Sequence, residues 1–500
     1  MFNRVLSFFR PQAAPAQAQS QDALDASRST RHREDKAYRR SFPTDEERNV
    51  SPWAAEKTRL ECRDLARNSP LVNAILGCLE RNVVGPEGMT PQARTANQDW
   101  NTAAEGVFRE RAKIMDYRGR LNLAGLQRLS VFTRPTDGNV FFVMTDTGQL
   151  QPIEAERIGT PPKLQSDGNI INGCQLDSEG RTLGWYVCTR SKSGGLDRQD
   201  YEFVEARDMI HLASPFRFDQ IFGHPDLAAV VNKIKDKEDF DISTLLTARL
   251  QSRNSIVIKT EQGAARASNL GAKDATGDTE QKRVKEEFDG YTQKIFVKPG
   301  ESSENIPNPT PGPQFVGFDE HLAQEICSRF GLPYDVVSMN FHKGSFAQSK
   351  AALVMAYKTI EAWQIWLRDA LMQRLWNWTI ARAIRDGLLP PAPVDERGFS
   401  TWYLVDWIFP GREWIDPKDA IDAEMAEFRM GKTTLSAITA KTGRDWEAQL
   451  EQKAKELQAA TELEKRYKLA PGTLINAFTN AQAPIENNGR PPNKDNANEP

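Results

Sequence analysis

A chain of 500 residues is longer than one hydrophobic core usually stabilises, so we expect several packed units. Hydrophobic residues make up 39% and charged residues 27% of the chain. The chain contains no apolar run near the roughly eighteen residues that a membrane span needs. The formal net charge of −3 argues against a protein that coats nucleic acid through bulk electrostatics, because such domains are strongly basic. Any contact with DNA is therefore expected to be local or transient.

The first fifty residues are expected to form a mobile arm. Residues 1–10 have neither the apolar core nor the small-residue cleavage site of a secretory signal, which favours a cytoplasmic protein. Residues 11–50 are rich in Ala, Gln, Ser and charged side chains, a composition that buries little surface. Two interpretations stay open, a solvated tail and an arm that touches a partner or DNA.

Residues 51–85 predict two helices. Ser51 is suited to cap the first helix before Pro52, and Pro70 separates the first helix from the second. Apolar residues follow at near-helical spacing: Leu60, Leu65, Leu71, Ile75 and Leu79. The second helix should end at Gly85.

Residues 130–215 predict a mixed β region. Its stretches, among them VFTRPTDGNVFFVM and YEFVEARDMIHLA, show short apolar runs that Asp-Gly or Glu-Gly turns divide. Residues 225–251 then predict one sustained helix, with Pro225 tolerated in its first turn.

Residues 261–313 are rich in Gly, Pro, Asn and charge, and predict loops with a short helix at 281–288 and a strand at 294–297. A second helix is expected over residues 319–330, where the Gly331-Leu332-Pro333 sequence stops it.

The longest proline-free stretch predicts a helix over residues 351–385. Its tryptophans lie on almost every side, so we expect it to be buried among neighbours. They are Trp363, Trp366, Trp376 and Trp378. A strand-like piece, TWYLVDWIF, and a charged helical region at 416–469 follow, while residues 484–500 cannot pack.

The sequence offers no recognisable catalytic chemistry. Gly431-Lys432-Thr433-Thr434 is like a phosphate-binding loop, but Ala426 stands where that loop needs its first glycine, and the residues before it predict helix instead of strand. The histidines and cysteines show no metal-ligand spacing, so the five cysteines are expected to be buried free thiols. These patterns predict a protein that is not an enzyme and needs no cofactor.

Several segments, taken in order, resemble the lambda-like portal family of tailed bacteriophages. They include QPIEAERIGTPP, GCQLDSEGRTLGWYV and MIHLASPFRFDQIFGHPDLA, and later QFVGFDEHLAQEICSRFGLPYDVVSMNF and WIDPKDAIDAEMAEFRMGKTTLSAITAKTGRDWE. No single motif is specific, but the ordered set spans roughly residues 50–465. The chain departs from the family at residues 346–350, where it keeps the positive charge of Lys350 and lacks the usual serine pair.

This resemblance implies an α+β portal fold that assembles as a ring, usually a dodecamer, around an axial channel. The implied parts are a mobile arm (1–50), a wing (51–224), a stem helix (225–251), a loop-rich clip (252–317), a stem helix and turn (318–338), a tunnel loop (339–350), a channel-adjacent helix with a wing strand (351–415), a helical crown (416–483) and a disordered tail (484–500).

The resemblance also implies functional residues and partners. The tunnel loop would bring His342, Lys343, Ser345 and Lys350 to the DNA channel. The clip would present Lys282, Arg283 and Lys285 to the terminase or an adaptor. The implied partners are further copies of the chain, double-stranded DNA, the terminase large subunit, the major capsid or scaffold protein and head-tail adaptor proteins, with no membrane. The expected location is the virion capsid vertex, and the host cytoplasm during assembly. The alternatives are another head-tail connector ring and, from a different class, a DNA-processing packaging enzyme.

Overall fold

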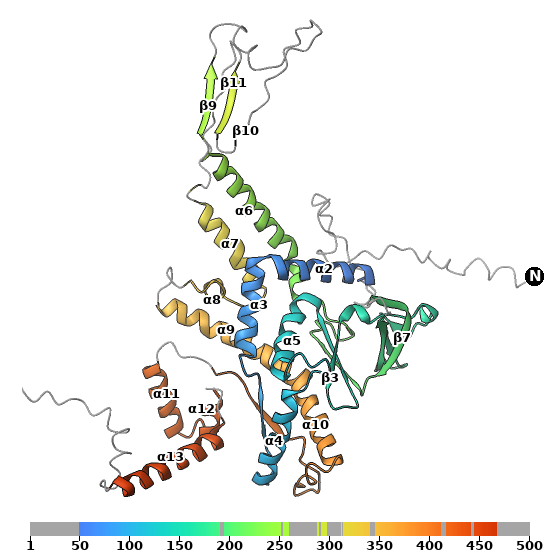
Figure 1. The fold of residues 1–500 in the computed structure, drawn as a ribbon, viewed down its shortest axis with the longest axis vertical. Helices are drawn as coiled ribbons and strands as arrows, with labels where there is room; N and C mark the ends of the chain where they lie inside the picture. Colours follow the sequence, from blue (N-terminus) through green and yellow to red (C-terminus); the bar gives the residue numbers. More distant parts are fainter. Residues whose placement is uncertain are drawn as a thin grey trace, which may run out of the picture. The chain divides into compact units, whose positions relative to one another are not determined.

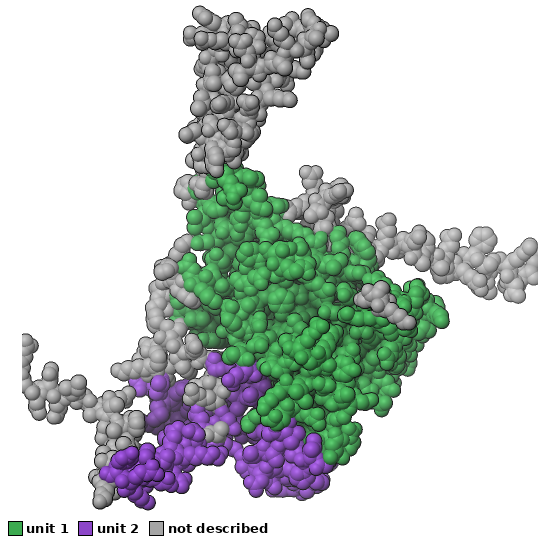
Figure 2. All heavy atoms as spheres, viewed as in Figure 1, with its two compact units in different colours: residues 1–86, 108–386 green, residues 87–107, 387–500 purple. Residues whose placement is uncertain are grey.

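The fold was analysed in a computed structural model, which describes residues 50–190, 195–251, 254–259, 288–289, 292–297, 312, 314–340, 346–411, 417–441 and 445–467. The chain forms two compact units, shown in Figure 2. Unit 1 contains residues 1–86 and 108–386, and unit 2 contains residues 87–107 and 387–500. Within the described parts of the chain, no helix is both long and apolar enough to span a membrane.

The two N-terminal helices are confirmed. Helix α2 (Pro52–Asn68) begins where the Ser51 hydroxyl accepts a hydrogen bond from the Ala54 N–H at 3.1 Å, and α3 (Pro70–Val83) follows directly. Their inner faces bury apolar residues against helix α5 (Leu123–Asp137).

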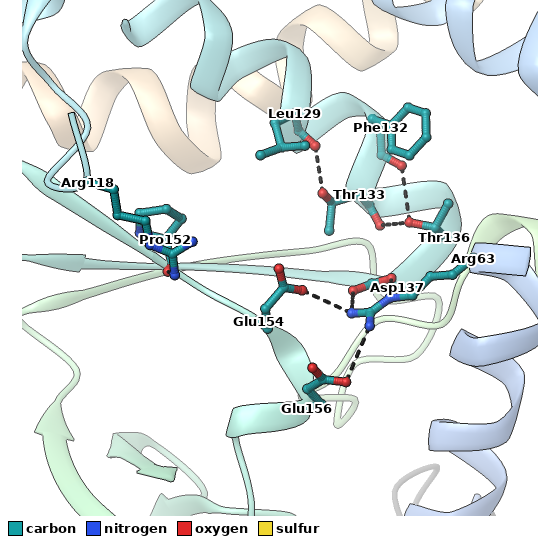
Figure 3. Close-up of polar contacts among 10 residues, drawn as sticks. All are labelled: Arg63, Arg118, Leu129, Phe132, Thr133, Thr136, Asp137, Pro152, Glu154 and Glu156. Atoms are coloured by element: carbon teal, nitrogen blue, oxygen red, sulfur yellow. Dashed lines mark hydrogen bonds and ion pairs between the residues drawn. The ribbon is translucent and has the colours of Figure 1, made fainter. Parts of the chain in front are cut away.

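Helix α5 corrects the sequence analysis, which expected strand-like structure from residue 130. Val131 is fully buried in this helix, and the Thr133 and Thr136 hydroxyls donate to the carbonyls of Leu129 and Phe132, one turn back (Figure 3). The β-branched residues are therefore accommodated by tertiary burial and by hydroxyl bonds inside the helix, which outweigh their strand propensity. Pro135 lies in the last turn, just before the helix ends at Gly138 in the left-handed region, with φ of 79°.

The expected mixed β region is confirmed after residue 138. The strands are β2 (Asn139–Met144), β3 (Leu150–Ile153), β4 (Ile170–Ile171), β5 (Cys174–Leu176), β6 (Thr182–Arg190), β7 (Leu196–Glu205) and β8 (Met209–Ala213). They form two antiparallel sheets, ordered β3-β2-β8 and β4-β5-β6-β7. Phe141 and Met209 from the first sheet pack with Trp185 and Val187 from the second, so one apolar core joins them.

The next two helices, α6 (Val231–Gln251) and α7 (Phe315–Ser328), are distant in sequence but pack as a pair, which we call the helical hairpin. Helix α6 follows a 3₁₀ turn, η5 (Asp226–Ala229), so it begins six residues later than the sequence predicted. Helix α7 begins four residues earlier than expected and lies beside α6 (Figure 1). Phe240 of α6 packs its ring 5.5 Å from that of Phe315 and 5.2 Å from that of Phe318.

Between these helices, three short strands form one sheet. Strand β11 (Thr292–Val297) pairs in parallel with β9 (Asn254–Lys259) and antiparallel with β10 (Phe288–Asp289). The predicted strand at 294–297 is confirmed as part of β11. Most of the predicted helix at 281–288 lies outside the described residues, and Phe288 belongs to a strand instead.

The predicted tryptophan-bearing helix is confirmed with one irregularity. Helix α9 (Phe346–Leu367) continues through a π-helical turn, η7 (Arg368–Met372), into α10 (Gln373–Arg385). Trp376 is completely buried, with its ring 5.4 Å from that of Phe108 of α4 (Gln98–Lys113). The sequence analysis assigned no helix to α4.

Unit 2 contains a two-stranded sheet and the C-terminal helices. Strand β1 (Thr90–Ala93) pairs antiparallel with β12 (Val405–Ile408), which confirms the strand predicted in TWYLVDWIF. The predicted helical region contains α11 (Pro417–Arg429), α12 (Leu435–Lys441) and α13 (Trp446–Tyr467). The Gln92 amide donates to the Asp445 carboxylate at 2.5 Å, which ties β1 to the start of α13.

Candidate functional site

Most of the predicted functional residues lie outside the part of the chain that the structure describes. This holds for Lys282, Arg283 and Lys285, and for His342, Lys343 and Ser345. Lys350 is described, and it is exposed near the start of α9. Of this set the described residues include only Lys350, and they also show how the turn before residues 341–345 is held.

The turn before residues 341–345 is packed against α9. Gly331 has φ of 63°, and a Cβ atom there would lie 2.5 Å from the Thr359 hydroxyl, so only glycine fits without rearrangement. The Thr359 hydroxyl in turn donates to the Gly331 carbonyl at 3.1 Å. Val337 of helix α8 (Tyr334–Ser338) is buried, and α8 ends at Met339, which has φ of 54°. The chain therefore enters residues 341–345 from a fixed position on α9.

A buried cluster of charged side chains joins the helical hairpin to α5. Asp226, at the base of α6, accepts from Arg134 of α5 at 3.1 Å and from Arg329, directly after α7, at 3.0 Å. The side chains of Asp226 and Arg134 are only 10% and 13% exposed. Burial lowers the pKa of Arg134, an effect that the charge of Asp226 opposes. Because arginine stays protonated in proteins, Asp226 is the carboxylate that compensates this buried charge.

The same arginine also contacts α9. The guanidinium carbon of Arg134 lies 3.9 Å from the Trp363 ring centre and 4.7 Å from that of Trp366, a cation–π arrangement. Trp366 donates its indole N–H to the Ala213 carbonyl at the end of β8, at 2.9 Å. One guanidinium thus links α5, the base of the hairpin and α9. The sequence analysis missed this cluster, although the Asp226 carboxylate directly before an apolar run was a usable signal.

A second charged cluster fixes the C-terminal end of α5. Arg63 of α2 donates to Asp137 at 2.8 and 2.5 Å, to Glu154 at 3.0 Å and to Glu156 at 3.3 Å (Figure 3). The hydrogen bond to Asp137 is the main cause of a raised pKa for Arg63. Glu154 and Glu156 belong to QPIEAERIGTPP, so these motif residues have a structural contact in this fold.

The half-buried His211 and the five buried cysteines behave as core residues. The His211 ring stacks on Phe141 with 4.3 Å between ring centres, and burial lowers its pKa to about 3, so it is neutral at physiological pH. All five cysteines are buried free thiols, as predicted. Across the described ranges, no group of His, Cys, Asp and Glu side chains could hold a metal ion.

The sequence that is like a phosphate-binding loop has a different structure. Gly431 lies in a turn between α11 and α12 with φ of 72°, and Lys432 forms an ion pair with Glu427 at 3.0 Å. A phosphate-binding loop connects a strand to a helix, whereas this turn connects two helices.

Exposed apolar side chains follow one side of each of two helices. On α9, Val354 and Met355 are 51% and 59% exposed, and Ile365 is also exposed. On α6, Ile242, Leu245 and Leu246 are each more than half exposed. On α6 the i, i+3 and i+4 spacing places the three side chains on one helix face. On α9, Val354 and Ile365 are eleven residues apart, about three turns, so they lie on the same face, and Met355 is adjacent to Val354. We call these the α9 apolar face and the α6 apolar face.

Comparison with known proteins finds similarity to phage portal proteins. A family model described as phage portal protein, lambda family, matches residues 33–364. A probable portal protein of Halomonas phage phiHAP-1 is 22% identical over 412 residues, which is 78% of each chain. Portal protein B of Escherichia phage lambda is 20% identical over 416 residues, which is 75% of each chain.

Similar solved structures come from gene transfer agent (GTA) particles. One titled as the neck of a native GTA particle computed with C12 symmetry has 13% sequence identity and a TM-score of 0.42, and the match covers 75% of this chain and 89% of the other. The virion of a native GTA particle gives 12% identity and a TM-score of 0.42, covering 74% and 89%.

The family model begins before α2 and extends almost to the end of α9, and the curated relatives are themselves portal proteins. Because this match includes most of the chain, the protein belongs to the lambda family of phage portal proteins.

Proposed function

We propose that this chain is the subunit of a homo-oligomeric ring, a dodecamer, at one vertex of a tailed-phage capsid. Double-stranded DNA would enter the capsid through the ring during packaging and leave through it during ejection. Family membership supports the portal role. The mildly acidic charge of the subunit suits a passage for DNA, because a strongly basic tunnel would hold the phosphate backbone and stop its movement.

The observation that carries the assembly proposal is the pair of exposed apolar faces. Burying a side chain such as Val, Ile, Leu or Met stabilises a structure by about 1.5–3 kcal/mol. Contiguous exposed apolar surface on a soluble protein commonly marks a contact with another protein. Two such faces on different helices of one subunit suit the head-to-tail contacts of a closed ring, in which each subunit meets two neighbours.

Charge on the α9 apolar face should prevent this assembly. We expect the double substitution Val354→Glu and Met355→Glu to yield folded monomers in place of rings, because each ring contact would bury two unpaired carboxylates. Multi-angle light scattering and negative-stain microscopy would measure the change. The matched variant Val354→Ile with Met355→Leu keeps the face apolar and should still form rings. Normal rings from the double glutamate variant would show that this face lies outside the subunit contact.

The chemistry of DNA movement would belong to a partner. We propose that the clip, residues 252–317, docks the terminase large subunit through Lys282, Arg283 and Lys285, and that head-tail adaptor proteins replace it after packaging. Further proposed contacts are with the major capsid or scaffold protein. A pull-down experiment tests these docking residues by comparing how much terminase binds to parent rings and to rings in which the three charges are reversed. Equal binding would exclude the three residues as the docking contact.

The tunnel loop, residues 339–350, is proposed to face passing DNA through His342, Lys343, Ser345 and Lys350. Ring symmetry would repeat each lysine around the channel, which makes a belt whose attraction for phosphate weakens with salt. We expect Lys343→Ala with Lys350→Ala to form normal rings and to retain less packaged DNA at low salt.

DNA retention by filled particles, measured across a salt series, checks this expectation. The matched control is Lys358→Ala, which removes another exposed lysine two turns further along α9. Retention equal to that of the parent at every salt concentration would leave the loop with a steric role or none.

Two alternatives remain distinguishable. Another head-tail connector ring would share the annular assembly but would not be needed for packaging. A DNA-processing enzyme would require nucleotide or metal chemistry, which neither the Gly431 turn nor the sequence patterns favour. We therefore propose a non-enzymatic role.

A further inference from the structure

A small cavity in unit 1 contains an unusual combination of polar groups. It is lined by Arg111 at the end of α4, by Gly148 in the turn between β2 and β3, and by the α10 residues Trp378, Thr379, Arg382 and Ala383. We call it the Arg382 pocket. Its volume is about 10 Å³, which is on the order of the space that one water molecule or one ligand oxygen requires. The charged side chains that line it are both arginines.

The Thr379 hydroxyl lacks the hydrogen bond that several other helical threonines make, and it shares this property with Thr58 of α2. Thr133, Thr244 and Thr439 each donate a hydrogen bond to the carbonyl one turn back in their helices. Thr379 is only 6% exposed, and its hydroxyl oxygen is buried with no hydrogen-bond partner. A buried hydroxyl without a partner is unfavourable. An oxygen atom in the pocket would supply that partner.

Arg382 brings a second donor to the same place, one that is ion-paired but not hydrogen-bonded. Its Nη2 donates to the Asp146 carbonyl, and its guanidinium lies against Gly148, where a Cβ atom would come within 3.2 Å of Nε. The buried Nε–H makes no hydrogen bond. It does form an ion pair at 3.4 Å with Asp386, whose carboxylate is shared with Arg385. The pocket therefore combines a hydroxyl donor and a guanidinium donor, with Arg111 as a second positive charge.

We propose that the Arg382 pocket binds one tetrahedral oxyanion of the phosphate class. One anion oxygen enters the pocket and accepts from the Thr379 hydroxyl and the Arg382 Nε–H. The remaining oxygens face Arg111, which is partly exposed. Charge-assisted bonds from arginine to phosphate oxygens are among the stronger hydrogen bonds in proteins. The anion is either a free phosphate ion or a phosphate group of nucleic acid.

Calorimetric titration of the purified full chain with inorganic phosphate, against chloride at matched ionic strength, tests the proposal. We expect saturable phosphate binding that weakens about tenfold in Thr379→Val, which removes the hydroxyl and keeps the shape, and by at least that factor in Arg111→Gln. The matched control Arg109→Gln removes an exposed arginine of α4 that does not line the pocket and should change the affinity less than about twofold. Thermal unfolding in phosphate-free buffer checks that each variant is folded.

The outcomes separate the two sources of the anion. If a short DNA duplex competes with phosphate for the parent protein, and this competition is weaker in Thr379→Val, the source of the anion is the DNA backbone. Phosphate binding without such competition would identify the free ion. No saturable binding in the parent, or equal affinity in the parent and Thr379→Val, would overturn the proposal. Ring formation is measured separately, so failure here leaves the proposed portal function untouched.

Discussion

Asp226→Asn is expected to lower the free energy of unfolding of unit 1 by about 3–5 kcal/mol. This is the range observed when one partner of a buried ion pair is removed and the other charge stays buried. The substitution keeps the side-chain size and removes the charge that compensates Arg134 and Arg329. Arg134 is 13% exposed and cannot lose its proton, so its charge would remain buried beside the Trp363 and Trp366 rings without the Asp226 carboxylate to compensate it.

Denaturant midpoints and thermal unfolding midpoints of the parent and the variant measure this effect. Glu110→Gln is the matched control, because it breaks an exposed ion pair with Lys113 in which the two side chains are 73% and 66% exposed. Exposed pairs contribute about 0–1 kcal/mol. If Asp226→Asn lowers the free energy of unfolding no more than Glu110→Gln does, the charged cluster does not stabilise the base of the hairpin.

Gly138→Ala is expected to destabilise unit 1 by about 3 kcal/mol or more, through two effects that add. Its φ of 79° is unfavourable for any residue with a Cβ, by about 1–2 kcal/mol. The new Cβ atom would also lie 2.4 Å from the Gly223 carbonyl oxygen and 2.6 Å from the His224 carbonyl carbon, so backbone must move.

That backbone is held in place by Asn139. Its amide donates to the Gly223 carbonyl at 2.8 Å, and its carbonyl oxygen accepts from the Gly223 N–H at 2.8 Å. Relaxation around a new methyl group at residue 138 would therefore break a buried pair of hydrogen bonds.

Gly180→Ala is the matched control for this prediction. Gly180 has φ of 84°, but a Cβ atom there would meet nothing within 4 Å. Its substitution should lower the free energy of unfolding only by the cost of placing a Cβ-bearing residue at positive φ, about 1–2 kcal/mol. The difference between the two unfolding free energies isolates the close approach at Gly138, and equal values would show that no such approach limits this site.

Local sequence patterns predicted much of the secondary structure correctly. Ser51 and Pro70 set the limits of α2 and α3, and the alternating apolar residues after Gly138 predicted the β region. The prediction failed at residues 131–137, where valine, phenylalanine and threonine favour a strand when they are judged alone and proline disfavours the interior of a helix. In the folded protein that segment packs against α2 and α3, and burial outweighs an intrinsic preference of at most about 1 kcal/mol per residue.

The candidate sites divide in the same way. Lys282, Arg283, Lys285, His342, Lys343, Ser345 and Lys350 came from the resemblance of the sequence to a family, and they remain proposals. The Asp226 cluster and the Arg382 pocket could not be predicted, because their side chains come from segments far apart in the chain. Arg111 and Arg382, for example, meet at one cavity only after α4 and α10 have packed.

The sequence by itself determined the family, most of the helical and β segments, and the absence of a recognisable catalytic motif, because these depend on residue order and local periodicity. Only the tertiary structure decided that α9 and α6 leave apolar faces exposed, that Asp226 compensates two arginines, and that Thr379, with its unpartnered hydroxyl, lines a cavity. Exposure and pairing depend on which distant segments cover a side chain, and no local pattern contains that information.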